Sequence, residues 1–194
     1  MKVLGIYGSP RKGGNSDLLL EEALKGAQSQ GAEISTIRPF KMDIQACSEC
    51  GSCDKTGICI IKDDMQALYP QLEEADIIFM ATPMFFYGMP SSIKALIDRC
   101  QALWSKRMLT KSPDKRKSYD SGCGYMVATG ATKGANLFEG AHLVAKYFYD
   151  ALDMSYEGSV CVNKVEGKGD IKNKPEELKA AFELGSQAVL NKKG

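Results

Sequence analysis

The chain has 194 residues, of which 44% are hydrophobic and 25% are charged, and its formal net charge is +1. This length suffices for one domain with a sizeable core, and the composition is ordinary for a soluble globular protein. No apolar run approaches the roughly 20 residues that cross a bilayer, and the N-terminus lacks a signal-peptide pattern, so we expect a cytoplasmic protein without a membrane partner.

Five apolar runs predict β-strands, at residues 2–8, 33–40, 75–83, 124–130 and 157–163. Helical patterns alternate with them, at residues 16–30, 64–74, 91–103, 136–153 and 175–191. This alternation predicts an α/β fold, a doubly wound five-stranded parallel sheet with helices on both faces. No linker or internal repeat interrupts the pattern, so residues 1–194 are expected to form a single domain.

Two further segments lie between the predicted strands and helices, one after the second strand (residues 47–59) and one before the fourth strand (residues 104–121). The second carries six cations, and we expect an exposed or subunit-contacting basic loop insertion. A docking surface for an acidic electron carrier is the alternative. Because no aromatic residues are interleaved with the cations, we expect no nucleic-acid partner.

The segment "GSPRKGGNS" (residues 8–16) joins the first strand to the first helix. It has neither the spacing of a nucleoside-triphosphate P-loop nor that of a dinucleotide-binding loop. Ser9, Asn15 and Ser16 can donate hydrogen bonds, Arg11 can make a charge-assisted contact, and the positive end of the helix dipole favours an anion. The pattern therefore indicates a terminal phosphate monoester, with a helix cap at Asn15 or Ser16 as the alternative.

Two further loops are expected at the carboxyl ends of neighbouring strands, where ligands bind in open α/β sheets. "PMFFYGMP" (residues 83–90) offers large apolar side chains that could enclose a flat ring, and "TGATKGAN" (residues 129–136) lets backbone approach closely. A packed apolar loop or a subunit contact is the alternative for the first of them. A phosphate at one loop and a planar ring at the other two fit FMN.

Four of the seven cysteines form the run "CSECGSCDKTGIC" (residues 47–59), at Cys47, Cys50, Cys53 and Cys59. Ferredoxin-type cluster loops begin with the same C-x2-C-x2-C spacing, whereas structural zinc sites more often use two separated pairs. The spacing thus favours an iron–sulfur cluster over zinc or free redox-active thiols. The remaining cysteines and the single histidine are expected to be structural, at Cys100, Cys123, Cys161 and His142.

The stretches "GSPRKGGNSDLLL" and "PMFFYGMPSSIKALIDR" resemble the NADPH-dependent FMN reductase and flavodoxin-like superfamily. The cysteine run between them resembles the iron–sulfur flavoproteins of anaerobic bacteria and archaea. The resemblance covers about residues 2–163. It implies a flavodoxin-like fold, non-covalent FMN, a [4Fe–4S] cluster and a homodimer or homotetramer that brings together the cofactors of neighbouring subunits.

The resemblance also implies which residues bind the cofactors. The FMN residues would be Ser9, Arg11, Asn15, Ser16, Pro83, Met84, Phe85, Phe86, Tyr87, Gly88, Thr129 and Gly130. The cluster ligands would be Cys47, Cys50, Cys53 and Cys59. Many relatives with a shortened cysteine run hold no cluster, and all four positions are filled here.

These observations predict a redox flavoprotein that moves electrons between a [4Fe–4S] cluster and FMN. The donor would be ferredoxin-like or NAD(P)H, and the acceptor a small molecule such as an oxygen species or a quinone. The cofactors would perform the chemistry, in keeping with the lack of a catalytic side-chain constellation. The alternatives are a cluster-free NAD(P)H-dependent FMN or quinone reductase and a non-catalytic, flavodoxin-like electron carrier.

Overall fold

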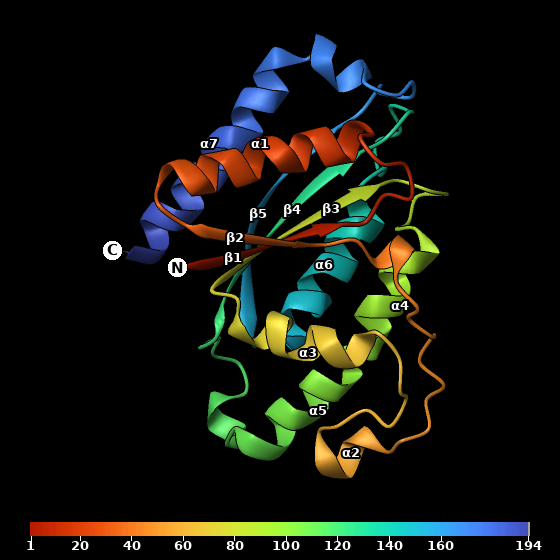
Figure 1. Cartoon of the computed structure of the whole chain (residues 1–194), viewed down its shortest axis with the longest axis vertical. Coiled ribbons are helices and arrows are strands. Elements are labelled where there is room, and N and C mark those ends of the chain that lie inside the picture. Colours follow the sequence, from red (N-terminus) through yellow and green to blue (C-terminus); the bar gives the residue numbers. More distant parts are fainter. Residues whose placement is uncertain (194) are drawn as a thin grey trace.

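The computed structural model describes residues 1–193, and its centre is a five-stranded parallel sheet (Figure 1). The strand order is β2-β1-β3-β4-β5, which is the doubly wound order of flavodoxin-like proteins. The strands are β1 (Lys2–Tyr7), β2 (Glu33–Ile37), β3 (Ile77–Pro83), β4 (Gly122–Thr129) and β5 (Met154–Val162). The predicted fold class is therefore confirmed.

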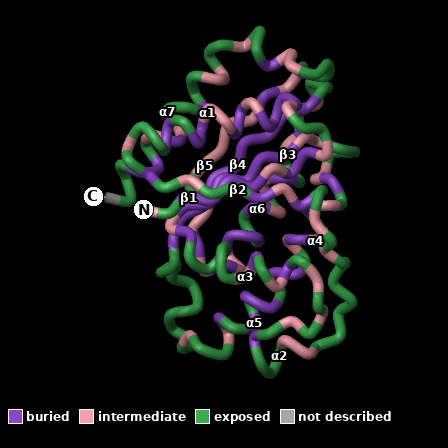
Figure 2. The backbone as a smooth tube through the Cα atoms, viewed as in Figure 1, coloured by how far each residue is buried: buried purple, intermediate pink, exposed green. Residues whose placement is uncertain are grey.

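Helices cover both faces of this sheet. They are α1 (Asn15–Ser29), α2 (Cys53–Thr56), α3 (Met65–Glu74), α4 (Ser91–Arg99), α5 (Gln101–Thr110), α6 (Glu139–Ala151) and α7 (Pro175–Lys193). Helices α1 and α7 lie on one face, and α3 to α6 lie on the other (Figure 1). The sheet is buried between these layers, while the cysteine segment around α2 is largely exposed (Figure 2).

The core beneath α1 depends on a very close approach of α1 to α7. A Cβ atom on Gly185 would lie 1.8 Å from the carbonyl oxygen of Ala23, and one on Gly26 would lie 2.0 Å from that of Phe182. Neither distance is possible for a real side chain, so the two glycines set how closely these helices pack. The position of α1 matters because its N-terminus borders the candidate site described below.

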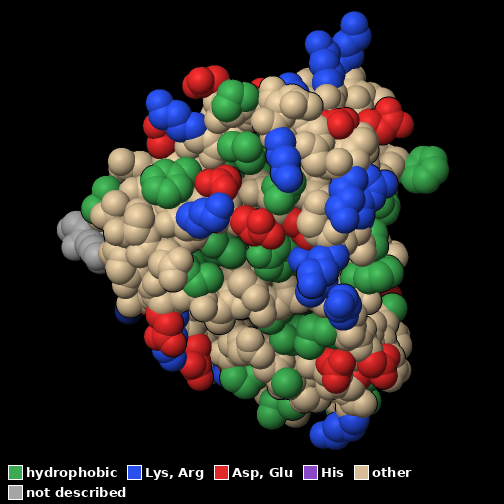
Figure 3. Space-filling view, turned by 45° about the horizontal axis from the view of Figure 1, so that its top comes forward, with side chains coloured by type: hydrophobic (Ala, Val, Ile, Leu, Met, Phe, Trp, Pro, Cys, Tyr) green, Lys and Arg blue, Asp and Glu red, His purple; other side chains and the backbone are tan. Residues whose placement is uncertain are grey.

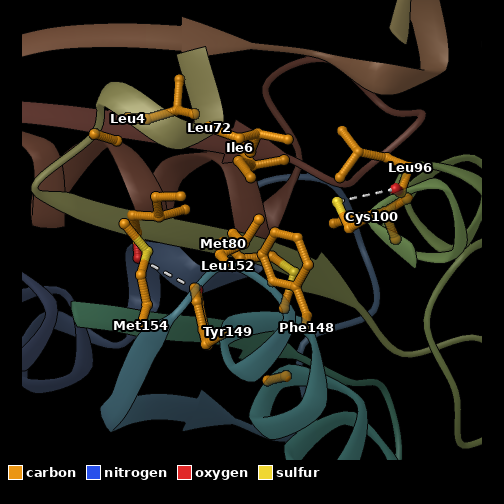
Figure 4. Close-up of a cluster of buried hydrophobic side chains, with 14 of the residues drawn as sticks. Leu4, Ile6, Leu72, Met80, Leu96, Cys100, Phe148, Tyr149, Leu152 and Met154 are labelled. Carbon is orange, nitrogen blue, oxygen red and sulfur yellow. Dashed lines mark hydrogen bonds between the residues drawn. The ribbon is translucent and has the colours of Figure 1, made fainter. Parts of the chain in front are cut away.

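The second core lies between the sheet and α3 to α6 and is rich in large side chains (Figure 4). Tyr149 is fully buried there and donates a hydrogen bond of 2.6 Å to the carbonyl oxygen of Tyr125. Cys100 is also fully buried, and its thiol donates to the carbonyl oxygen of Leu96 at 3.4 Å. Burial raises the pKa of the Cys100 thiol well above its usual value, so this cysteine has a packing role, as expected.

The remaining structural predictions are confirmed only in part. Cys123 is buried, but Cys161 is only half-buried, where its sulfur lies 3.7 Å from Nε2 of His142. The other ring nitrogen of His142 lies 2.8 Å from the hydroxyl of Tyr156. These three side chains link α6 to β5 at the edge of the sheet and line none of the pockets described below.

The basic insertion predicted at residues 104–121 is wrong in its first part, because helix α5 continues to Thr110. The predicted helix 91–103 is instead two helices, with Cys100 between α4 and α5. Arg107 is charged, which predicts an exposed side chain, but in the structure its side chain is buried and points into the fold rather than into solvent. Ala102 and Leu103 are buried on the same helix, which gives α5 its inward face.

Several cations of this segment are neutralised within the chain. The Arg107 guanidinium lies 3.1 Å from the carboxylate of Asp150 and 3.0 Å from that of Asp153. Lys111 lies 2.7 Å from Asp153, and Lys106 pairs with a carboxylate of α3. These pairs argue against a docking surface made by all six cations. None of the described helices is long and apolar enough to cross a membrane.

Candidate cofactor sites

The three loops that the sequence singled out meet at the carboxyl ends of β1, β3 and β4, around a pocket of about 280 Å³. Its lining residues are Ser9, Pro10, Arg11, Gly14, Asn15, Ser16, Pro83, Phe85, Thr129, Gly130, Ala131, Val165 and Glu166. Eight of the twelve predicted flavin residues are in this lining. The four that are not are Met84, Phe86, Tyr87 and Gly88.

The N-terminus of α1 forms one wall of this pocket without a capping side chain. The N-cap residue is Gly14, whose backbone is extended, and neither Asn15 nor Ser16 caps the helix. The Ser9 hydroxyl accepts a hydrogen bond of 3.1 Å from the backbone N–H of Arg11. The first-turn N–H groups therefore present the positive end of the helix to the pocket, an arrangement that suits an anion.

The side chain of Asn15 is engaged by the loop after β5. Its amide oxygen accepts hydrogen bonds from the backbone N–H groups of Gly169 (3.0 Å) and Ile171 (3.2 Å). Its amide nitrogen donates to the carbonyl oxygen of Gly167 at 2.9 Å. In this conformation Asn15 ties two loops together, and what it offers the pocket is mainly its backbone N–H.

A buried ion pair beneath the first loop was not predicted. Asp17 is fully buried, and its Oδ2 atom accepts hydrogen bonds from the Gly13 N–H (2.9 Å) and from Nη2 of Arg38 (2.8 Å). Arg38 also donates to the carbonyl oxygen of Ser9 at 3.2 Å, and its guanidinium lies 4.2 Å from the centre of the Tyr7 ring. Arg38 thus holds both ends of the loop that borders the pocket. An acidic residue in the first turn of α1 was the only local signal for this network.

The loop after β3 contains a tight turn in an unusual conformation. Phe85 and Gly88 exchange two backbone hydrogen bonds of 2.9 Å, and between them Phe86 (φ 50°) and Tyr87 (φ 60°) are both left-handed. Such turns normally carry Asn and Gly, so this one is strained. Phe86 is fully exposed, and the Tyr87 hydroxyl lies so close to Gly134 that a Cβ there would be 2.1 Å away. Tyr87 therefore connects this turn to the loop after β4.

All four clustered cysteines line a second, larger cavity of about 620 Å³. Their thiols are free, and the described residues contain no group of three or more His, Cys, Asp or Glu side chains placed to hold a single metal ion. Hydrogen bonding from Ser52 lowers the pKa of the Cys50 thiol, and burial raises that of Cys53. Four cysteines around one cavity, three of them in the C-x2-C-x2-C spacing of ferredoxin-type cluster loops, are a donor set that suits an iron–sulfur cluster.

Helix α5 packs against the segment that lines this cavity. The short helix α2 packs against α5, and a Cβ atom on Gly57 would lie 2.7 Å from the Cβ atom of Lys106. The Ser105 hydroxyl lies 3.8 Å from the sulfur of Cys53. Gly57 is left-handed (φ 68°), as is Gly51 (φ 70°) within the cysteine run, and both positions therefore favour glycine.

Helix α4 connects the two candidate sites within the chain. It begins at Ser91, directly after the loop 83–90, and ends at Arg99, which lines the cysteine cavity. Nine residues of α-helix span about 13 Å. One rigid element therefore fixes the cavity of the four cysteines relative to the pocket at the sheet edge.

Comparisons with known proteins point in the same direction. Residues 1–165 match the protein family described as NADPH-dependent FMN reductase. The chain is 37% identical over 112 residues to an iron–sulfur flavoprotein of Methanosarcina thermophila. This alignment covers 58% of this chain and 59% of that protein. The alignments with the iron–sulfur flavoproteins span about half of those proteins' length.

Two further matches extend over nearly the whole chain. A Bacillus subtilis protein named as an NAD(P)H-dependent FMN-containing oxidoreductase is 27% identical over 187 residues, which is 95% of this chain and 96% of that protein. The solved structure of a flavone reductase superposes with a TM-score of 0.70 at 21% identity, over 100% of this chain and 63% of that one. At this identity the structural likeness concerns the fold alone.

Proposed function

Since the chain belongs to the NADPH-dependent FMN reductase family, we propose that it is an FMN-dependent oxidoreductase with its flavin in the pocket at the start of α1. The observation that carries this proposal is the convergence of three loops, one suited to an anion and two suited to a ring, on a single pocket. The phosphate would be bound by the first-turn N–H groups of α1 together with Ser16 and Arg11. The ring would lie against Phe85 and against the backbone at Thr129 and Gly130.

In this site the protein binds and orients, and the bound flavin supplies the redox chemistry. The uncapped helix end provides N–H donors that need no rearrangement when the phosphate binds. The small residues Gly130 and Ala131 leave room for backbone to approach the ring edge. No side chain of the pocket is required as a general acid or base for electron transfer.

The four clustered cysteines would hold a [4Fe–4S] cluster that exchanges single electrons with the flavin. This part of the proposal is supported by the C-x2-C-x2-C spacing, by four free thiols around one cavity, and by the similarity to iron–sulfur flavoproteins. A ferredoxin-like donor would deliver the electrons, and a small acceptor, an oxygen species or a quinone, would receive them. The chemistry fits a carrier that converts one-electron input into two-electron output.

A cluster-free NAD(P)H-dependent reductase is the second candidate, favoured by the near full-length similarity to the Bacillus subtilis oxidoreductase. Anaerobic purification followed by analysis of iron, sulfide and flavin separates the two candidates. We expect about one FMN and four irons per chain, and flavin reduction by a reduced ferredoxin that outpaces reduction by NADPH. Flavin without iron, together with rapid reduction by NADPH, would establish the second candidate instead.

The proposed assembly is a homodimer or homotetramer. Several large apolar side chains are exposed, and on the face shown in Figure 3 hydrophobic groups lie among charged ones. Phe86 and Tyr87 are exposed beside the proposed flavin pocket, and a groove of about 550 Å³ between α4, α5 and α6 is lined by Trp104, Leu143 and Tyr147. A second copy that covered these side chains would remove apolar surface from water.

A further inference from the structure

One buried arginine, Arg99, bonds to the chain at both ends of the cysteine segment. Both Nη atoms of Arg99 bond to the carboxylate of Asp63, at 2.6 and 3.1 Å, and the side chains of both residues are fully buried. Nη1 also donates to the carbonyl oxygen of Gln45 at 3.0 Å, and Nη2 donates to that of Ile61 at 3.4 Å. Gln45 lies two residues before the first clustered cysteine, and Ile61 lies two residues after the last.

Asp63 completes the closure from the other side. Its Oδ2 atom accepts a hydrogen bond of 2.9 Å from the backbone N–H of Gln45, and its Oδ1 atom accepts one of 3.1 Å from that of Met65 at the start of α3. Burial opposes ionisation of Asp63, but the hydrogen bonds from Arg99 and Gln45 bring the pKa of its carboxyl below the usual value. The carboxylate is therefore ionised, and it joins both ends of the segment to α3 and α4.

The chain on either side of the segment is joined by two further hydrogen bonds, from the Asp64 N–H to the carbonyl oxygen of Asp43 (3.0 Å) and from the Asp43 N–H to Oδ2 of Asp64 (2.8 Å). The Gln66 side chain donates to the carbonyl oxygens of Ile61 (2.6 Å) and Cys59 (3.2 Å), and α2 rests on α5. Cys47 and Cys50 are exposed. A buried ion pair is weak evidence for stability, because dehydrating two charges costs about as much as their attraction returns. A role in positioning explains better why an arginine with four protein acceptors lies at this place.

We propose that Arg99 is a positioning residue for the cluster, which holds the two ends of the cysteine segment together so that its four thiols face one cavity. This inference rests on the proposed function. The fixed positive charge of Arg99, which lines the same cavity, would also offset the negative charge that four thiolates bring to a bound cluster. Lysine cannot replace it, because an ammonium lacks the planar fork that reaches Gln45, Ile61 and Asp63 at once.

The test compares Arg99→Met and Arg99→Lys with Arg107→Met, all purified without oxygen. Arg107 is a matched control, because it is also a buried arginine paired with carboxylates, but it neither lines the cysteine cavity nor bonds to the cysteine segment. In the presence of a chelator, we expect iron loss to be roughly tenfold faster in both Arg99 variants, as for other residues that orient metal ligands. FMN content should stay at the wild-type level, and Arg107→Met should keep its iron.

Amide hydrogen exchange of residues 46–62 in the metal-free chain provides an independent readout. Faster exchange in Arg99→Met than in both wild type and Arg107→Met supports the proposal, and unchanged exchange overturns it. Wild-type iron retention in the Arg99 variants, or equal iron loss in Arg107→Met, overturns it as well. If the wild-type protein binds no iron at all, the proposed function fails by that result alone, and the exchange experiment then decides whether Arg99 orders the segment.

Discussion

At the scale of single residues, two arginines have the same structural role at different sites, since each bonds to both ends of one loop. Arg38 bonds to the Ser9 carbonyl and the Asp17 carboxylate, on either side of the first loop, and Arg99 bonds to both ends of the cysteine segment. Each guanidinium binds several acceptors at once, which a planar fork of donors permits. Both loops therefore have a fixed shape before any ligand is present, and preorganisation of this kind lowers the cost of binding.

The first prediction concerns Arg38. Replacing it with Met leaves Asp17 buried without its cation, which should cost about 3 kcal/mol of unfolding free energy and loosen the first loop. We expect FMN affinity to fall about tenfold, while affinity for riboflavin, which lacks the phosphate, stays nearly constant. Fluorescence titration of the apoprotein with each flavin measures both. An equal loss for the two flavins would show that the loop does not serve the phosphate. Lys41→Gln, an exposed cation just beyond β2, is the control.

The second prediction concerns the thiols. Alanine at Cys53 should abolish cluster assembly, because three thiolates would remain for four irons, while FMN binding and the fold persist. Cys161→Ala is the matched control, since Cys161 lies on β5 away from the cavity lining. Iron and sulfide analysis together with the visible spectrum measure the effect. If Cys53→Ala contained as much iron as wild type, Cys53 would not be a ligand.

A third prediction follows from the ionised carboxylate of Asp63. Its pKa is lower in the folded chain than in the unfolded chain, so unfolded molecules bind more protons in acid. The stabilisation is complete above the unfolded value, near pH 4, and it is lost as the pH falls through the folded value. We expect the midpoint of urea unfolding to decline below about pH 4 and to decline less steeply in Asp63→Asn. Parallel pH profiles for the two proteins would contradict this origin of the acid sensitivity.

At the scale of elements, the strained turn after β3 is informative. Phe86 and Tyr87 occupy the two left-handed positions that Asn and Gly normally fill, at a cost of order 1 kcal/mol each. The fourth prediction is that Phe86→Asn raises the unfolding free energy by about 1 kcal/mol, whereas the β-branched Phe86→Val lowers it. Thermal denaturation of the apoprotein measures both. A destabilised Phe86→Asn would mean that the exposed ring makes contacts in the assembled protein that outweigh the strain.

The elements also show how far the sequence alone could lead. The periodicity of hydrophobic residues and the composition of the strands predict the sheet and α1, because both signals are local. The meeting of the loops at the strand ends follows from the parallel topology. The pairs Arg38–Asp17 and Arg99–Asp63 could not be predicted, because their partners are 21 and 36 residues apart in sequence. The sequence pattern does not predict the helical continuation to Thr110, because charged residues such as Arg107 and Lys111 are typical of exposed positions. In the fold their partners lie on α6 and just after it.

At the scale of the whole molecule, the issue is how electrons would pass between the two proposed cofactors. Within one chain, α4 separates the pocket from the cysteine cavity by about 13 Å of helix, and the cavity faces outward beside α2. The exposed side chains of Phe86 and Tyr87 lie at the pocket end of this helix, where a second copy could cover them. An isologous contact there would give each flavin a cluster from the neighbouring subunit.

The last prediction is therefore a homo-oligomer in which transfer crosses the subunit interface. Sedimentation should give a dimer or a tetramer, and mixing two defective proteins should restore function. One partner, Cys53→Ala, should lack the cluster, and the other, Arg11→Ala with Ser16→Ala, should bind flavin weakly because the proposed phosphate contacts would be lost. After subunit exchange, a donor that reduces only the cluster should reduce flavin in the mixture and in neither parent alone. A monomer that passes electrons from cluster to flavin, or a mixed oligomer that stays inactive, would place the route within one chain, along α4.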